Sequence, residues 1–200
     1  NLNYCIAIGK KLNDRIMDSV IHGPTLEYYN HYTETNRELS ELAHRISILL
    51  MEEHINSVVI EPTISALDSD NFDSKALTYR FSHKMAATRS GIGWIGKTDL
   101  LISEKFGPRV RFVSLLTNHP LELSREPINE SRCGTCSLCV DACPAHAATG
   151  KSWDITVHRD EFIDIFKCRD TCIVLCLMNF HKEATICGIC VSVCPVGRGG

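Results

Sequence analysis

The spacing of the cysteines near the carboxyl end constrains this chain more than any other feature. Residues 133–144 read CGTCSLCVDACP, with Cys133, Cys136, Cys139 and Cys143 followed by proline. A shorter run, CGICVSVCP, holds Cys187, Cys190 and Cys194 before a second proline. The C-x2-C-x2-C-x3-C-P spacing is typical of two-cluster ferredoxins, in which three close thiolates hold one cluster and the fourth binds the other. The cysteines therefore predict a ferredoxin-like module with two [4Fe–4S] clusters.

The same pattern divides the ligands between the two clusters. Cluster I is expected to take Cys133, Cys136 and Cys139, with Cys194 crossing over from the second run. Cluster II is expected to take Cys143, Cys187 and Cys190, which leaves one ligand open. Zinc is the competing interpretation, but structural zinc sites favour two separated C-x2-C pairs. The triple run followed by Cys-Pro favours iron–sulfur.

Three further cysteines are candidates for the eighth ligand: Cys168, Cys172 and Cys176, in KCRDTCIVLC. We favour Cys168, because it follows EFIDIFK and opens a predicted helix, where the helix dipole stabilises a thiolate. Cys172 lies one turn further on and is the alternative. Cys176 lies in the apolar stretch IVLCLM, which suits a packing role.

Composition restricts the compartment and the partners. Ten of the eleven cysteines lie between 133 and 194 at metal-ligand spacings, so we expect a reducing, cytoplasmic location. The net charge of -3 and a pI near 6.3 do not indicate a nucleic-acid or membrane-surface protein. No signal-peptide pattern is seen in the given sequence and no apolar run reaches membrane-spanning length, so no membrane partner is expected.

Residues 1–125 alternate strand-like and helix-like segments and predict an α+β cofactor-binding domain. Strands are expected at 4–9, 55–62, 99–103 and 109–118. A long helix is expected around Leu39–Leu50, capped by Thr33 or Thr35, and a short one follows Ser82. Residues 121–132 read as a linker. The double-cluster module occupies 126–200.

The segment GIGWIGKT, from Gly91 to Thr98, satisfies the G-x-x-x-x-G-K-[ST] phosphate-loop pattern. Such a loop binds phosphate only when it leaves a strand and enters a helix. Here a helix-like segment precedes it and the strand-like DLLIS follows, so we expect a cofactor cleft and not ATP. Glycines admit close approach of a large flat group, and Trp94 offers a planar face. Seven Lys or Arg between Arg80 and Arg111 would suit a ligand rich in phosphate or carbonyl oxygens.

The segments HKMAATRSGIGWIGKTDLLISEKFG, CGTCSLCVDACP and CGICVSVCP together resemble the epoxyqueuosine reductases and, more distantly, the reductive dehalogenases. The resemblance implies a nitroreductase-like α+β domain that binds cobalamin and receives electrons from the two clusters. It also supports Cys168, since IDIFKC is similar to the family's LDARRC-type segment, although Cys172 has a family-like context too. It implies an electron donor of flavodoxin or ferredoxin type, and a small-molecule or modified-nucleoside substrate.

We expect the cofactor contacts in and after the glycine loop, at Gly93, Trp94, Gly96, Lys97, Thr98 and Leu101. The family's aspartate acid lies seven residues before the position of Lys84, which here is Leu77. Tyr79 or His83 is then the nearest candidate proton donor, with Tyr79 similar to the tyrosine acid of reductive dehalogenases. The chain begins near the family's first central strand, so residues that cover the corrinoid are expected to be missing.

Two other functions remain open at this stage. One is an electron-transfer protein whose front domain is a docking scaffold, and Leu77 at the acid position favours it. The other is a flavin-containing iron–sulfur protein, since nitroreductase-like domains commonly hold FMN.

Overall fold

The computed structural model describes residues 2–63, 72–122 and 125–198. Its central sheet has three antiparallel strands in the order β1-β7-β2, where β1 is Tyr4–Lys11, β7 is Val110–Thr117 and β2 is Ser57–Ile60. β1 pairs with β7 along its whole length, from Tyr4 opposite Thr117 to Lys11 opposite Val110. The strands expected from the sequence are confirmed, and β1 continues two residues beyond the predicted end.

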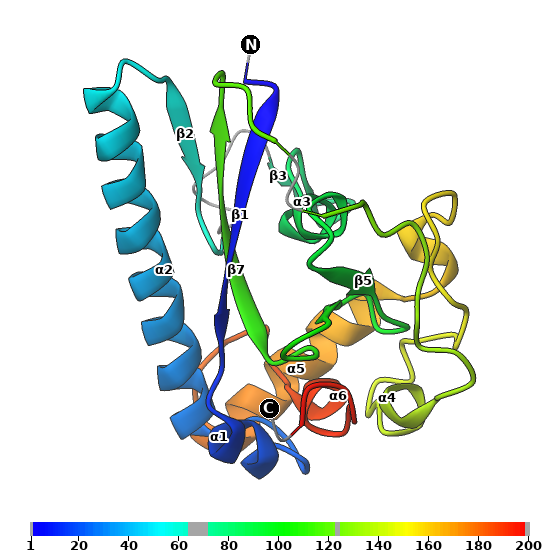
Figure 1. Ribbon diagram of the computed structural model, residues 1–200. Coiled ribbons are helices and arrows are strands. Elements are labelled where there is room, and N and C mark those ends of the chain that lie inside the picture. Colours follow the sequence, from blue (N-terminus) through cyan, green and yellow to red (C-terminus); the bar gives the residue numbers. More distant parts are fainter. Residues whose placement is uncertain (1, 64–71, 123–124, 199–200) are drawn as a thin grey trace.

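One face of the sheet is covered by the long helix α2, Leu26–Glu52, which runs beside all three strands (Figure 1). Leu39 and Ala43 of this helix pack against Val113 and Leu115 of β7 in a buried core. The predicted helix is confirmed, but the predicted cap is wrong. Thr25 caps the helix, because its hydroxyl accepts the Tyr28 N–H at 3.1 Å. Thr33 and Thr35 lie inside the helix, which starts earlier than the apolar periodicity indicates.

The opposite face carries α3, His83–Arg89, with Ala87 packed against Leu101 and Phe112. Ser82 caps α3 as predicted, accepting the Met85 N–H at 3.3 Å. After α3 the chain forms a two-stranded antiparallel sheet of β5 (Gly93–Ile95) and β6 (Leu101–Ser103). Strand β5 within the glycine loop was not predicted.

Short elements complete the front part of the chain. They are α1 (Asp14–Ser19) and the two-residue strands β3 (Phe72–Asp73) and β4 (Thr78–Tyr79), which form a small hairpin. The cysteine-rich part contains α4 (Leu138–Asp141), a 3-10 turn at Arg159–Glu161, α5 (Ile165–Phe180) and α6 (Ile189–Ser192). The helix predicted to open near Cys168 is confirmed: Asp164 caps α5 by accepting the Lys167 N–H at 3.0 Å.

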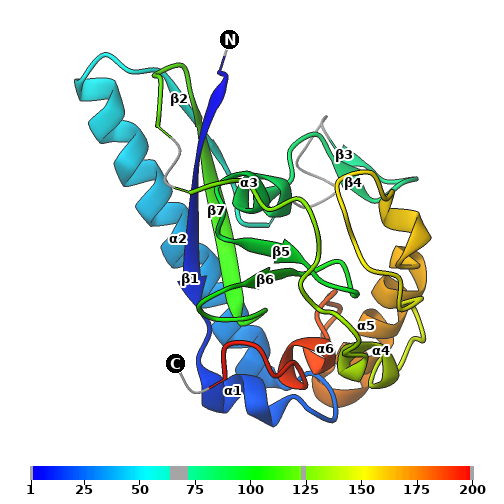
Figure 2. The same ribbon diagram turned by 45° about the vertical axis from the view of Figure 1, so that its right-hand side comes forward.

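The front and cysteine-rich parts lie against each other (Figure 2) and share apolar cores. Met17 and Val20 of the front part pack with Cys176, Ile186 and Val191. A second core joins Trp94 and Ile102 to Ile128, Ala147, Trp153, Phe162 and Ile163. The proposed boundary at 125/126 stays a prediction, and two residues of the proposed linker, 123 and 124, lie outside the described residues. Among the described helices, none is long and apolar enough to cross a membrane.

Candidate metal centres

The structure gathers cysteines into two neighbouring groups. The first group contains Cys133, Cys136 and Cys139, from the turns before and at the start of α4, and Cys194, which follows α6. Burial raises the pKa of the Cys139 thiol to about 11, and the nearby sulfurs of Cys133, Cys194 and Cys136 add to the rise. These four are the residues assigned to cluster I from their spacing.

The second group contains Cys168 and Cys172 of α5, with Cys187 and Cys190 at the start of α6. The Cys172 thiol lies beside the sulfurs of Cys168 and Cys187, and its interaction with Cys187 lowers the pKa of Cys187 to about 7. Burial raises the pKa of Cys190 to about 12. Cys139 of the first group is close enough to Cys190 to contribute to that rise, so the two groups are adjacent.

The eighth ligand stays a prediction. Cys168 lies in the first turn of α5 and Cys172 one turn later, and both lie beside Cys187. Cys143 packs against the same apolar core as Cys168. Cys168 as the ligand, with Cys172 as the alternative, fits this arrangement.

Cys176 has a separate role at the end of α5. Its side chain is fully buried, and its thiol donates to the Ile186 carbonyl at 3.1 Å. Ile186 directly precedes Cys187, so Cys176 supports the backbone that presents a cluster ligand. Its burial among apolar residues matches the packing role expected from the sequence.

The donor set suits iron–sulfur clusters. All eleven cysteines are free thiols, and ten of them lie in the cysteine-rich part. Within the described residues, no three His, Cys, Asp or Glu side chains are arranged to hold one metal ion. A [4Fe–4S] cluster needs a different arrangement, since each thiolate binds a separate iron. The four cysteines of the first group would hold cluster I. Cluster II would be held by Cys143, Cys187 and Cys190, with Cys168 or, as the alternative, Cys172.

The glycine loop lies against the cluster-binding turns. The Trp94 indole Nε1 donates to Cys133 Sγ at 3.4 Å. The Lys97 ammonium is buried and donates to the carbonyls of Gly134 at 3.0 Å and Cys136 at 2.9 Å. Thr98 lies beside Cys190, and its side chain opposes the rise of the Cys190 pKa. The loop therefore contacts both cysteine groups.

Packing alone explains Gly93 and Gly96 of this loop. A Cβ at Gly93 would lie 2.1 Å from the Ile102 carbonyl oxygen across the β5–β6 pair, and one at Gly96 would lie 2.9 Å from the Ile102 side chain. Leu101 is buried in the core with Ala87 and Phe112. Cofactor contacts at Gly93, Gly96 and Leu101 stay predictions, and these residues already have structural roles.

Several of the basic residues of 80–111 bind partners inside the protein. Lys84 pairs with Asp99, Lys97 binds two carbonyls, and Arg89 donates to the Ile128 carbonyl at 2.6 Å. Arg111 contacts the Tyr32 hydroxyl and the Pro62 carbonyl. A charge count along the chain does not reveal such internal partners. Arg80 and Lys105 are exposed, and a role of the basic residues in binding a ligand stays a prediction.

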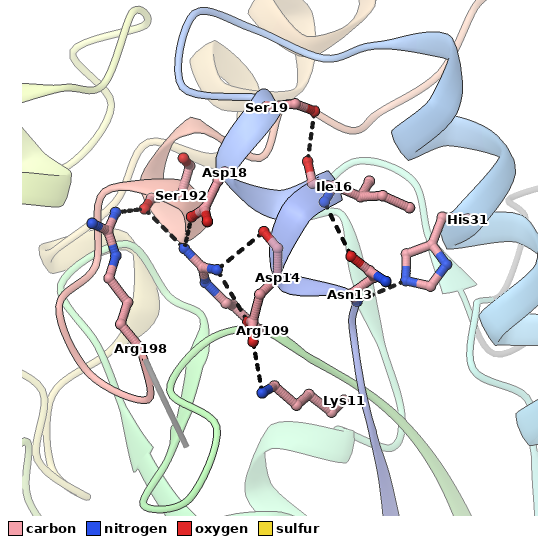
Figure 3. A network of polar contacts seen from close by, with 10 residues as sticks. All are labelled: Lys11, Asn13, Asp14, Ile16, Asp18, Ser19, His31, Arg109, Ser192 and Arg198. Atoms are coloured by element: carbon pink, nitrogen blue, oxygen red, sulfur yellow. Dashed lines mark hydrogen bonds and ion pairs between the residues drawn. The ribbon is translucent and has the colours of Figure 1, made fainter.

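Arg109 joins the front part to the segment that carries Cys194 (Figure 3). Its guanidinium is 1% exposed and donates to Asp14 Oδ1 at 3.1 Å, to Asp18 Oδ1 at 2.6 Å and to the Ser192 carbonyl at 3.4 Å. Gly107, two residues earlier, lies so close to Val196 that a Cβ would be 1.9 Å from the Val196 carbonyl oxygen. These contacts hold the chain on either side of Cys194.

A cavity of about 350 Å³ lies between the two parts. The front part contributes eight residues to its lining: Leu77, Thr78, Tyr79, Phe81, Ser82, Lys84, Ile95 and Asp99. The cysteine-rich part contributes Trp153, Val157, Arg159 and Phe162. Tyr79, the predicted proton donor, is therefore at this cavity, while Leu77 occupies the wall where relatives are expected to place an acid.

His83, the other candidate donor, is not among the residues that line this cavity. Its ring nitrogens lie 2.8 Å from Ser114 Oγ and 2.8 Å from the Glu61 carbonyl. Burial lowers the His83 pKa, which favours the neutral ring. This geometry indicates a structural role for His83.

Sequence reasoning missed two polar residues at the cavity. Asp99 is nearly buried and pairs with Lys84, its Oδ2 and carbonyl oxygen lying 2.5 and 2.9 Å from Lys84 Nζ. Arg159 donates to the carbonyls of Leu77 at 3.0 Å and Ala76 at 2.7 Å, which ties the β3–β4 hairpin to the cysteine-rich part. Asp99 directly follows the glycine loop in the sequence, and this position could have marked it as a residue of the site. Nothing local marked Arg159, since its partners lie about eighty residues away.

The comparisons with known proteins agree with the cysteine arrangement. A family model described as a 4Fe-4S double cluster binding domain matches residues 132–197. The epoxyqueuosine reductase of Listeria monocytogenes is 31% identical over 143 residues, which are 68% of this chain and 35% of that protein. The epoxyqueuosine reductase of Synechococcus sp. is 45% identical over 64 residues, 32% of this chain and 19% of that one.

Solved structures share the fold at lower identity. A reductive dehalogenase structure described as suggesting a mechanism for B12-dependent dehalogenation matches 97% of this chain and 26% of its own, with a TM-score of 0.69 and 15% identity. A selenomethionine-labelled epoxyqueuosine reductase matches 98% of this chain and 49% of its own, with a TM-score of 0.59 and 20% identity.

The chain thus spans about a third of the length of the Listeria relative. Over that part, it is a relative of the epoxyqueuosine reductases and carries a 4Fe-4S double cluster binding domain.

Proposed function

We propose that this chain is part of an iron–sulfur reductase, in which two [4Fe–4S] clusters deliver electrons to a corrinoid at the cavity beside Tyr79. One observation carries the proposal. The loop that contacts both cysteine groups through Trp94 and Thr98 also lines the cavity through Ile95. Successive side chains of a strand point to opposite faces, so β5 separates the first cysteine group from the cavity by one strand.

The lining of the cavity suits a flat organic cofactor. Tyr79, Phe81, Trp153 and Phe162 offer aromatic surface, while Lys84 and Asp99 supply a paired charge at the wall. A volume of about 350 Å³ accepts only part of a corrinoid. This chain therefore provides one wall of the site, consistent with its covering about a third of the Listeria relative. A corrinoid bound here would supply a strongly reducing metal centre.

The residues of the chain have separate tasks in this proposal. The first cysteine group holds cluster I, Cys143, Cys168, Cys187 and Cys190 hold cluster II, and the Tyr79 hydroxyl is the proton donor at the cavity. Arg159 fixes the hairpin that carries Tyr79 by binding the Leu77 and Ala76 carbonyls. A nitroreductase-like arrangement of the front part and an electron donor of flavodoxin or ferredoxin type belong to the same proposal. The substrate is a small molecule or a modified nucleoside.

Anaerobically purified protein with reconstituted clusters tests the proposal by cofactor extraction and by titration with hydroxocobalamin. Val157 lines the cavity, so Val157→Trp fills it, whereas Ile155→Trp in the same loop changes an exposed residue outside the lining. We expect hydroxocobalamin to bind the wild type and Ile155→Trp, and binding to Val157→Trp to fall at least about tenfold. FMN binding with the same pattern would favour the flavin alternative. Clusters with neither cofactor bound would favour the electron-transfer protein.

A further inference from the structure

The segment Gly93–Thr98, here called the loop, places a side-chain donor on a sulfur of the first cysteine group. The Trp94 Nε1–H points at Cys133 Sγ, 3.4 Å away. In the same segment, Lys97 donates to the Gly134 and Cys136 carbonyls and fastens the loop to the turn that carries Cys133. Thr98, at the end of the loop, lies beside Cys190 of the second group.

The environment of Trp94 makes its hydrogen bond well defined. Its side chain is 6% exposed and packs with Ile102 and Ile128, so water does not compete for the N–H. The Arg132 guanidinium lies 5.7 Å from the ring centroid and is itself paired with Glu104. An indole N–H is a donor only, and Cys133 Sγ is the acceptor that this geometry provides.

We propose that the loop tunes the reduction potential of cluster I, the Trp94 N–H raising that potential. Reduction adds one negative charge to a cluster, part of which resides on its sulfurs. A donor on a ligand sulfur therefore stabilises the reduced form more than the oxidised form. The inference rests on the two-cluster part of the proposed function and does not depend on the ligand of the cavity.

Two conservative substitutions test this effect. Trp94→Phe keeps an aromatic ring and removes the N–H that points at Cys133. Thr98→Val removes a hydroxyl from the same loop and keeps the shape of the side chain. Anaerobic redox titrations of the reconstituted protein, followed by electron paramagnetic resonance, report each cluster. We expect Trp94→Phe to shift only cluster I to a more negative potential, lowering its reduced-to-oxidised ratio about fivefold at a fixed potential. Thr98→Val is the matched control in the same loop and should leave the potential of cluster I unchanged.

A second measurement covers the case in which Trp94→Phe fails to assemble cluster I. The chain has two tryptophans, Trp94 and Trp153. Protein labelled with 15N at the indole nitrogen should show a magnetic coupling between that nitrogen and reduced cluster I, and the coupling should persist in Trp153→Phe. Absence of the coupling, or unchanged potentials in a protein with two clusters, overturns this inference alone. A wild-type protein that assembles fewer than two clusters overturns the proposed function as well.

Discussion

The Lys97 ammonium lies 2.9 Å from the Cys136 carbonyl oxygen and 3.0 Å from that of Gly134. Lys97 is the lysine of the segment that matches the phosphate-loop pattern. It binds the turn that carries the first cysteine group. The elements around it have the wrong order for phosphate, since α3 precedes the loop and β6 follows it. Its charge stabilises a cluster-binding turn.

We predict that Lys97→Met lowers the free energy of unfolding by about 2 kcal/mol, because two buried carbonyls lose a charged donor. Chemical denaturation of the reconstituted protein without oxygen measures this change. Lys75→Met, at an exposed position in the β3–β4 turn, is the control and should be silent. Calorimetric titration with Mg-ATP should show no binding to the wild type. Tight ATP binding that Lys97→Met abolishes would contradict this assignment.

The second prediction concerns the eighth thiolate. Cys168→Ser should disrupt cluster II and leave cluster I largely intact, because Cys168 lies at the start of α5 beside Cys187. Electron paramagnetic resonance of the reduced protein and iron analysis measure the loss. If Cys168→Ser keeps both signals and Cys172→Ser loses one, the ligand is one helical turn further on.

Cys176 supplies the matched control for that experiment. Cys176→Ser retains a donor for the Ile186 carbonyl and should keep both clusters. Cys176→Ala removes the donor from a buried position and should cost about 1–3 kcal/mol in unfolding free energy while retaining both clusters. Loss of a cluster in Cys176→Ser would show that Cys176 is a ligand.

The cysteine spacing predicted much of this arrangement because iron–sulfur ligands follow local geometric rules. The spacing predicted that Cys194 lies with the first group, although more than fifty residues separate it from Cys139. The structure confirms this placement. The strands and α3 followed from periodicity and capping. The cap at Thr25 was missed because the first turns of α2 lack the apolar spacing that marked its centre. The pairing of Lys84 with Asp99 and of Arg159 with Leu77 depends on tertiary packing, which residue types alone do not specify.

Replacement of Arg109 tests the connection between the two parts of the chain. Arg109→Met should lower the unfolding free energy by about 1–3 kcal/mol, since it leaves the Ser192 carbonyl without its donor and removes the shared partner of the partly exposed Asp14 and Asp18 carboxylates. Arg125→Gln, which breaks an exposed ion pair with Glu104, should cost less than about 1 kcal/mol. Equal effects of the two substitutions in urea unfolding would refute the anchoring role of Arg109.

His83 predicts a specific dependence of stability on pH. Burial lowers its pKa in the folded protein, so the unfolded chain takes up a proton at a higher pH than the folded one. The contribution of His83 to the free energy of unfolding is complete above the ordinary histidine pKa of about 6.5. It is lost as the pH falls towards the lowered pKa of His83 in the folded protein. Between pH 8 and pH 5, His83→Gln should therefore lose less unfolding free energy than the wild type. His22→Gln, at an exposed position, should follow the wild type; identical slopes for all three proteins would contradict this prediction.

The most direct test of the proposed function is electron transfer from the clusters to a corrinoid. Reconstituted protein with about eight irons per chain is reduced, freed of reductant and mixed without oxygen with hydroxocobalamin. We predict that the cobalamin spectrum shows reduction by about two electrons per chain, one from each cluster, while the cluster signals disappear. Val157→Trp should slow this reaction, and Ile155→Trp should not. Clusters that stay reduced beside oxidised cobalamin, or equal rates in both variants, would contradict the proposal.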